Sequence, residues 1–181
     1  MKCNNGKTAA WFAAGILAAL GIITAPRLVR ADGNDGAETR LRRLEAHQEI
    51  ENLFAAYGAT LDRHDFDAFG RLFTEDAVYG SGPGATHGRV AIQAMLEKQI
   101  SSNPSNLPGP DYHLFFNPSI QVTGDHAVAT SKGAYVIPDA ANNGVRLVFF
   151  VQYDDTLVRK GGRWLFASRA LRAGAPPPAA K

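Results

Sequence analysis

Cysteine is almost absent from this sequence: the single one, Cys3, lies close to the N-terminus. One cysteine cannot form an internal disulfide and does not supply a set of thiolate ligands for zinc. The sequence also has no glycine-rich phosphate loop and no cluster of Cys and His ligands. These absences predict a fold stabilised by packing alone, and a function that uses no cofactor and no metal.

A surplus of charge is lacking as well, with 19 Lys and Arg beside 17 Asp and Glu. The first 31 residues contain Lys2, Lys7, Arg27 and Arg30 but no acidic residue, so 15 basic residues remain after them. A chain without excess positive charge has little with which to neutralise phosphates. We therefore expect no nucleic-acid partner.

Residues 1–31 have the pattern of a secretory signal peptide. Two lysines precede a mostly apolar run over residues 11–25, and the small residue Ala31 ends the segment. The alternative is an uncleaved anchor, but a membrane span needs roughly 20 apolar residues, and Pro26 and Arg27 interrupt this run. We expect cleavage after Ala31, a periplasmic or secreted protein, and no membrane contact after cleavage.

The residues that remain suit a single domain. Residues 32–37 have the composition of a flexible leader, residues 38–173 form the domain, and the Pro/Ala-rich residues 174–181 suit a disordered tail. Apolar residues at helical spacing predict an amphipathic first helix that ends near residue 62. Its buried stripe is expected to contain Leu41, Leu44, Ile50, Leu53, Phe54, Tyr57 and Leu61.

Further elements follow from the same kind of pattern. Short helices are predicted at residues 66–73 and 89–100, and a brief strand at residues 77–79. Four long strands are predicted at residues 112–123, 126–137, 145–159 and 163–172, joined by glycine-containing turns. Helices followed by an antiparallel meander predict an α+β fold, with the sheet curved round the helices on one face.

Several short strings occur in a fixed order along residues 38–172. They are Ile50-Glu51-Asn52-Leu53, Leu61-Asp62-Arg63-His64-Asp65, Leu72-Phe73-Thr74-Glu75-Asp76-Ala77-Val78, Gly88-Arg89, His113-Leu114-Phe115-Phe116-Asn117-Pro118 and Gly162-Arg163-Trp164. Their order resembles the SnoaL-like family of the NTF2-like superfamily. The resemblance implies a cone in which a curved antiparallel sheet wraps round about three N-terminal helices and encloses a pocket.

Within that superfamily the pattern is similar to the group of scytalone dehydratase, bile-acid dehydratase and hexachlorocyclohexane dehydrochlorinase, which use an Asp–His dyad. The resemblance places the aspartate at Asp62 and the histidine at His113. It also places a polar residue at Tyr57 and an arginine at Arg169. It implies a cofactor-independent lyase, dehydratase-like, that acts on a small hydrophobic cyclic or aromatic molecule.

The chemistry of such an elimination needs a base and a group that stabilises the charge that develops. His113 would be the base, oriented by Asp62, while Tyr57 would donate a hydrogen bond and Arg169 would supply a positive charge. On an alternating strand, residues 113, 115 and 117 share one face. The expected substrate-binding residues are Asn117, Phe115, Tyr79, Tyr135, Phe149 and Tyr153.

The same residues also have ordinary structural interpretations. Asp62 could be a solvated charge at a helix end, and His113 a satisfied core or edge histidine. Arg169 could form a salt bridge with a carboxylate such as Asp155, and strand alternation places it on the face opposite Trp164. The dyad would equally serve an isomerase or a carbon–carbon lyase, and the fold could bind a small ligand without catalysis.

The resemblance also implies a homo-oligomer, a dimer or a trimer, because SnoaL-like domains commonly associate through the exposed face of the sheet. Val148, Phe150 and Val158 would supply the apolar surface on the strand at residues 145–159. The expected partners are therefore a small hydrophobic substrate and other copies of the same chain.

Overall fold

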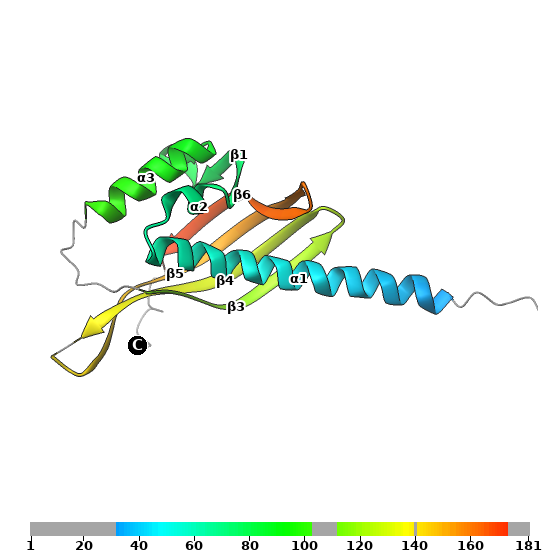
Figure 1. The fold of residues 1–181 in the computed structure, drawn as a ribbon, viewed down its shortest axis with the longest axis horizontal. Coiled ribbons are helices and arrows are strands. Elements are labelled where there is room, and N and C mark those ends of the chain that lie inside the picture. The colour runs from blue at the N-terminus through cyan, green and yellow to red at the C-terminus, as the bar shows by residue number, and fades with distance from the viewer. Residues whose placement is uncertain (1–31, 103–111, 140, 174–181) are drawn as a thin grey trace, which may run out of the picture.

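The computed structural model describes residues 32–102, 112–139 and 141–173, with only the backbone for residues 32–35. The predicted signal peptide, residues 1–31, and the predicted tail, residues 174–181, lie outside these residues. The described residues form three α-helices, one short 3-10 helix and six strands (Figure 1). In this part of the chain, no helix has both the length and the apolarity needed to cross a membrane.

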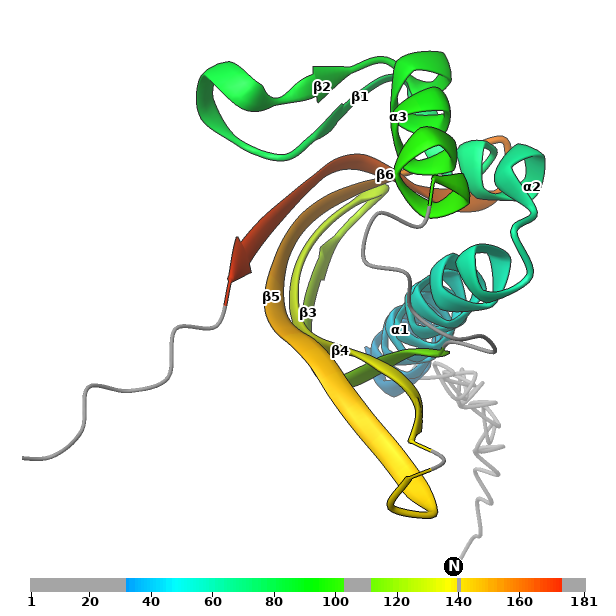
Figure 2. The same ribbon diagram turned by 90° about the vertical axis from the view of Figure 1, so that its left-hand side faces the viewer.

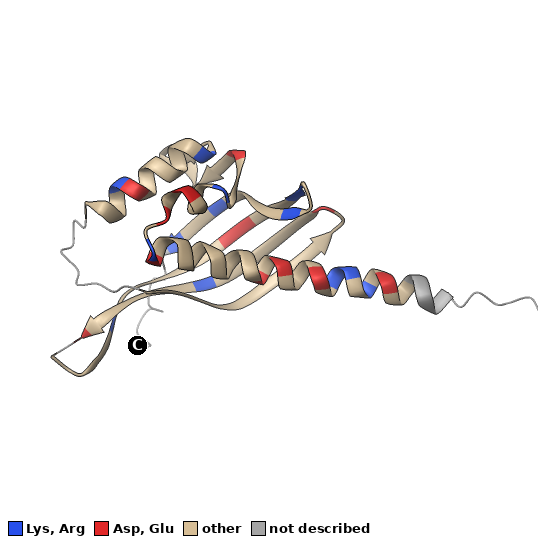
Figure 3. Cartoon of the chain, in the orientation of Figure 1, with Lys and Arg blue, Asp and Glu red and all other residues tan. Residues whose placement is uncertain are grey.

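The first helix, α1 (Asp32–Asp62), begins earlier than predicted, because residues 32–37 are helical rather than a flexible leader. Its N-terminal part extends beyond the sheet (Figure 1) and carries charges of both signs (Figure 3). Leu41 and Leu44, predicted to be buried, are 55% and 67% exposed because they lie on this extension. The buried stripe of α1 therefore begins only at Ala46.

The C-terminus of α1 is closed by a Schellman motif. The N–H of Asp65 donates to the carbonyl of Thr60, and the N–H of His64 donates to that of Leu61, both at 2.9 Å. His64 occupies the left-handed position of the motif with φ of 55°. This arrangement stops the helix immediately after Asp62 and fixes the place of its carboxylate.

Shorter elements follow along the chain. Helix α2 (Phe66–Gly70) is capped by the side chain of Asp65, which accepts a hydrogen bond from the N–H of Ala68 at 3.0 Å. Strand β1 (Phe73–Tyr79) is longer than predicted, and the loop after it contains the 3-10 helix η1 (Gly82–Gly84) and strand β2 (Thr86–His87). Helix α3 (Arg89–Ser101) matches the prediction closely.

The four remaining strands are β3 (Tyr112–Thr123), β4 (His126–Asp139), β5 (Gly144–Lys160) and β6 (Arg163–Ala173), each within two residues of its predicted ends. The sheet order is β2-β1-β6-β5-β4-β3. All neighbouring strands are antiparallel except β1 and β6, which run parallel. The sheet is therefore mixed and not wholly antiparallel as predicted, because the meander brings its last strand back beside β1.

The sheet curves, and the helices cover its concave face (Figure 2). Helix α1 contacts β3 and β6, whereas α3 contacts β1, β2 and α2. The core between these layers is strongly aromatic: the ring of Tyr57 lies 5.2 Å from that of Phe69, 5.6 Å from that of Phe115 and 5.8 Å from that of Phe166. The α+β cone predicted from the sequence is confirmed.

Candidate active site

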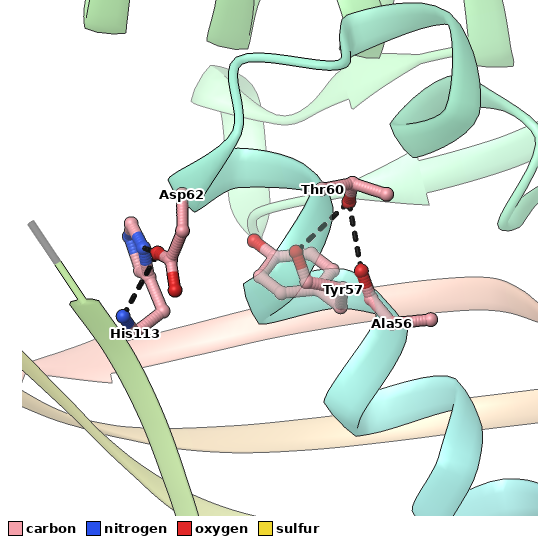
Figure 4. A network of polar contacts seen from close by, with 5 residues as sticks. All are labelled: Ala56, Tyr57, Thr60, Asp62 and His113. Atoms are coloured by element: carbon pink, nitrogen blue, oxygen red, sulfur yellow. Dashed lines mark hydrogen bonds and ion pairs between the residues drawn. The ribbon is translucent and has the colours of Figure 1, made fainter.

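Asp62, the last residue of α1, lies against His113 near the start of β3 (Figure 4). Its Oδ1 is 2.7 Å from Nδ1 of His113 and also accepts the backbone N–H of His113 at 3.0 Å. The side chains are 22% and 11% exposed, respectively. The pair is thus shielded from bulk water but open to a small molecule.

The contact fixes how His113 can act. A carboxylate only accepts hydrogen bonds, so a neutral imidazole donates through Nδ1–H and keeps its lone pair on Nε2. Asp62 also stabilises the imidazolium that would form when Nε2 takes a proton. The geometry therefore suits a general base with an orienting carboxylate.

Gly58 allows β3 to approach α1 this closely. A Cβ atom on Gly58 would lie 2.9 Å from the main-chain oxygen of His113 and 3.2 Å from the ring of Phe115. Any other residue there would push the strand away from the helix. The sequence analysis did not identify Gly58, although an isolated glycine inside a helical pattern is a signal of close packing.

The dyad lines a cavity of about 520 Å³ between α1 and β3, within the size range of small-molecule sites. Most of its wall is apolar. The lining residues are Glu51, Phe54, Ala55, Ala59, Asp62, His113, Leu114, Phe115, Phe116, Pro118 and Ser131. Of the predicted site residues, Asp62, His113 and Phe115 lie here, whereas Ser131 was not predicted because nothing in its local sequence marks it.

Arg169 does not join the dyad among these lining residues. It is fully buried, with Nε 3.0 Å from Oδ1 of Asp155 and Nη2 donating to Oδ2 at 3.2 Å. Five aromatic rings surround the guanidinium, the nearest being those of Tyr153 at 4.0 Å and Tyr57 at 4.1 Å. The alternative interpretation, a salt bridge to Asp155, is confirmed.

The prediction that Arg169 faces away from Trp164 is wrong. Thr156 pairs with Ser168 and Leu157 with Phe166, so β6 has one extra residue at this point. Such a bulge reverses the alternation of the strand. Arg169 therefore points into the core, with its guanidinium 4.4 Å from the ring of Phe166.

Burial changes the ionisation of the groups around Arg169. Loss of solvation raises the pKa of Asp155 to about 6, although the guanidinium of Arg169 opposes the rise. Burial also raises the pKa of Tyr57 and of Tyr79, whose hydroxyls are 2.9 Å apart. Both tyrosines are therefore protonated, and their hydroxyls form a neutral hydrogen-bonded pair.

The other predicted binding residues divide between two places. Tyr153 packs in the core, its ring 5.3 Å from that of Phe115. Tyr135 lies 4.8 Å from the ring of His113 and stacks on Phe149 at 5.2 Å, so this aromatic pair borders the dyad. Of these predicted residues, Tyr153 thus lies in the core behind the site, and the pair of Tyr135 and Phe149 lies beside His113.

Asn117 departs from the prediction that it shares a face with His113 and Phe115. It is exposed, has φ of 51°, and lies at a β-bulge in β3. The bulge ends the regular alternation after Phe116, which turns Asn117 away. Across the described residues, no three His, Cys, Asp or Glu side chains gather in a way that could hold a metal ion.

A curved mixed sheet with helices on its concave face and a cavity of small-molecule size defines the class of cone-shaped α+β proteins. The chain belongs to the SnoaL-like domain family, whose profile matches residues 42–170. No curated protein matches the chain in sequence.

Solved structures share this fold. An NTF2-like protein with a cystatin-like fold from Novosphingobium aromaticivorans is 23% identical, with a TM-score of 0.66 over 82% of this chain and 95% of that one. ActVI-ORFA from Streptomyces coelicolor is 24% identical, with a TM-score of 0.65 over 75% and 99%. A candidate scytalone dehydratase from N. aromaticivorans is 24% identical, with a TM-score of 0.61 over 74% and 87%. At these identities, the likeness shows the NTF2-like fold alone.

Proposed function

We propose that this protein is a cofactor-independent lyase that removes water from a small hydrophobic cyclic molecule. The observation that carries the proposal is the contact between Asp62 and His113 in the wall of an apolar cavity. The family includes enzymes of this kind, and one protein of the same fold is described as a candidate scytalone dehydratase.

In the proposed reaction, Nε2 of His113 takes a proton from a carbon beside a carbonyl group or a ring. The electrons of the broken C–H bond form a carbon–carbon double bond as the hydroxyl group leaves. Asp62 stabilises the imidazolium during this step. The imidazolium then gives its proton to the departing hydroxyl, which releases water and restores the neutral base.

Proton abstraction can be tested before the natural substrate is known. In D₂O, exchange of the acidic C–H protons of 2-tetralone, a two-ring ketone, is followed by NMR. We expect the wild-type protein to accelerate exchange and His113→Ala or Asp62→Asn to lower the rate about 10²- to 10⁴-fold. His126→Ala is the matched control, because His126 is exposed at the start of β4.

Dehydration is tested separately with fused-ring β-hydroxyketones, whose absorbance rises when water is lost. Exchange without loss of water would favour an isomerase, and release of a carbon fragment would favour a carbon–carbon lyase. If the wild type and both dyad variants bind fused-ring ketones equally and none accelerates exchange, the lyase proposal fails and a binding protein remains.

We further propose that the protein acts outside the cytoplasm, on the basis of the signal-peptide pattern in residues 1–31. Expression of the full chain in a bacterium with periplasmic fractionation tests this proposal. The expected product is a periplasmic or secreted protein whose mass corresponds to a start at Asp32. An intact chain retained in the cytoplasm would contradict it.

A further inference from the structure

Ser131 is a buried polar residue that the proposed reaction does not use. It lies on the inward face of β4, is 2% exposed and lines the cavity beside Phe115. Its hydroxyl has no hydrogen-bond partner among the described residues. Because buried hydroxyl groups are almost always hydrogen-bonded in folded proteins, an unpaired one in a cavity wall points to a ligand.

The bulge in β3 lies opposite Ser131. Asn117 and Pro118 of β3 together lie opposite the single residue Ser131 of β4. A regular strand would place a side chain of β3 beside this serine, whereas the bulge turns Asn117 outward. Pro118 lines the cavity at the same point. The irregularity of the strand thus leaves Ser131 without a regular cross-strand partner in β3, and its buried hydroxyl group belongs to the cavity wall.

The distance between Ser131 and the dyad sets the length of the ligand. His113 pairs with Tyr135, and Ser131 lies four residues further along β4, which corresponds to about 13 Å of strand. On the helix side, the lining extends from Glu51 to Asp62, which lies eleven residues further along α1, or roughly 16 Å. A single six-membered ring is too short to reach both ends of such a groove, whereas a fused-ring system is long enough.

The wall between the two polar ends is apolar and contains flat side chains. Phe54 and Phe115 stack with ring centroids 6.5 Å apart, and both line the cavity. Ala55 and Ala59 leave space on the helix side. The cavity therefore offers a long apolar slot with hydrogen-bonding groups at its two ends.

We propose that Ser131 determines substrate specificity by binding an oxygen substituent at the end of a fused-ring substrate remote from the carbon that His113 deprotonates. This inference rests on the proposed function only for which end of the substrate reacts. The hydroxyl of Ser131 both donates and accepts, so it suits a phenol or a ring carbonyl. The occupant of the groove is thus an elongated polycyclic molecule with oxygen at both ends.

The test compares two ligands and two variants by isothermal titration calorimetry. The probes are 2,6-dihydroxyanthraquinone, which has a hydroxyl at each end, and the parent anthraquinone, which has neither. Ser131→Ala should weaken binding of the dihydroxy probe roughly three- to tenfold, the value of one neutral hydrogen bond, and leave the parent unchanged. Thr130→Ala is the matched control, because Thr130 is the exposed neighbour on the opposite face of β4.

Thermal unfolding gives a second readout. Removal of a buried hydroxyl without a partner should raise the melting temperature of the free Ser131→Ala protein, while the same change weakens binding of the dihydroxy probe. A lower melting temperature would show that the hydroxyl is satisfied within the protein and would overturn the inference. An equal effect of Ser131→Ala on both probes, or no effect on either, would overturn it as well.

The outcome is separable from that of the lyase proposal. His113→Ala should keep the dependence of dihydroxyanthraquinone binding on Ser131, because the hydroxyl acts without the base. If this dependence appears but no ketone undergoes proton exchange, the lyase proposal fails and the role of Ser131 stands. If proton exchange depends on His113 but Ser131→Ala does not change binding of the dihydroxy probe, only the role of Ser131 is wrong.

Discussion

Gly58 is the residue on which the dyad geometry depends. Its lack of a side chain lets the main chain of His113 lie against α1, and this contact brings the imidazole to Asp62. Gly58, which is not among the residues that line the cavity, therefore controls the distance between two residues that do. Distances of this kind matter greatly, because a misplacement of about 1 Å can lower a rate 10²-fold.

We expect Gly58→Ala to lower the rate of ketone proton exchange at least about tenfold and to destabilise the fold by roughly 1 to 3 kcal/mol, as overpacked sites do. Urea unfolding and the exchange assay measure the two effects. Gly36→Ala is the control, because a Cβ atom there meets no atom within 4 Å, and it should stabilise α1 by roughly 0.5 to 1 kcal/mol. Equal behaviour of the two variants would contradict this role of Gly58.

Also at the residue scale, the stability of the fold depends on the buried ion pair of Arg169 and Asp155. We expect Asp155→Leu to destabilise the protein by about 3 to 5 kcal/mol, because it leaves a buried guanidinium without its counter-ion. The double variant Asp155→Leu, Arg169→Met should recover most of the loss, since it removes both charges. Denaturant unfolding of the two variants decides the matter, and a double variant as unstable as the single one would contradict the explanation.

At the scale of elements, the end of α1 is held by a motif that normally contains glycine. His64 takes the left-handed conformation there, which is unfavourable for a residue with a side chain. We expect His64→Gly to raise the free energy of unfolding by roughly 0.5 to 1 kcal/mol without changing ketone exchange. His47→Gly, inside the same helix, should lower it by about 1 kcal/mol. A less stable His64→Gly would mean that the ring contact with Phe66 outweighs the strain.

The sequence predicted elements better than it predicted contacts. The long strands and α3 are recognisable because alternation, helical spacing and glycine turns are local signals. The length of α1, the bulges at Asn117 and in β6, and the parallel pairing of β1 depend on tertiary structure, so residue spacing did not reveal them. For the same reason, the contact of Asp62 with His113 came from the family resemblance, whereas the burial of Arg169 needed the structure.

At the scale of the whole molecule, the raised pKa of a buried carboxyl group predicts an unusual dependence of stability on pH. The folded protein raises the pKa of Asp155 from its ordinary value near 3.8 to about 6. Between these values the folded state binds more protons than the unfolded state. The stability that the protonated Asp155 contributes is therefore complete below about pH 4 and is lost as the pH rises through about 6. Unfolding at a series of pH values should show the trend in the wild type but not in Asp155→Leu, Arg169→Met.

The apolar surface of the sheet is also a property of the whole molecule. Many large apolar side chains are exposed along β3, β4 and β5, namely Tyr112, Leu114, Val128, Val145, Leu147, Val148, Phe149 and Phe150. The bulge between β4 and β5 falls at Val148. We propose that a second copy of the chain covers part of this surface, because exposed apolar areas of this kind mark protein interfaces.

Sedimentation velocity at micromolar concentration tests the association. The wild type should form a dimer or a trimer, and Phe150→Lys should shift it towards the monomer. Val90→Lys is the control, because Val90 is exposed on α3, away from the long strands. A monomeric wild type would contradict the proposal.

Asp62 also contributes to the hydrogen bonding of the open edge of the sheet. β3 is an edge strand, and the backbone N–H of His113 points away from β4 and donates to Asp62 instead of to another strand. The carboxylate thus accepts a hydrogen bond from a backbone N–H at the sheet edge, where that group could otherwise pair with a further strand. In hydrogen exchange, Asp62→Ala should speed exchange of the His113 amide, whereas His113→Ala should leave that amide protected. Loss of activity in Asp62 variants will therefore combine a chemical effect with local opening of the strand that carries the base.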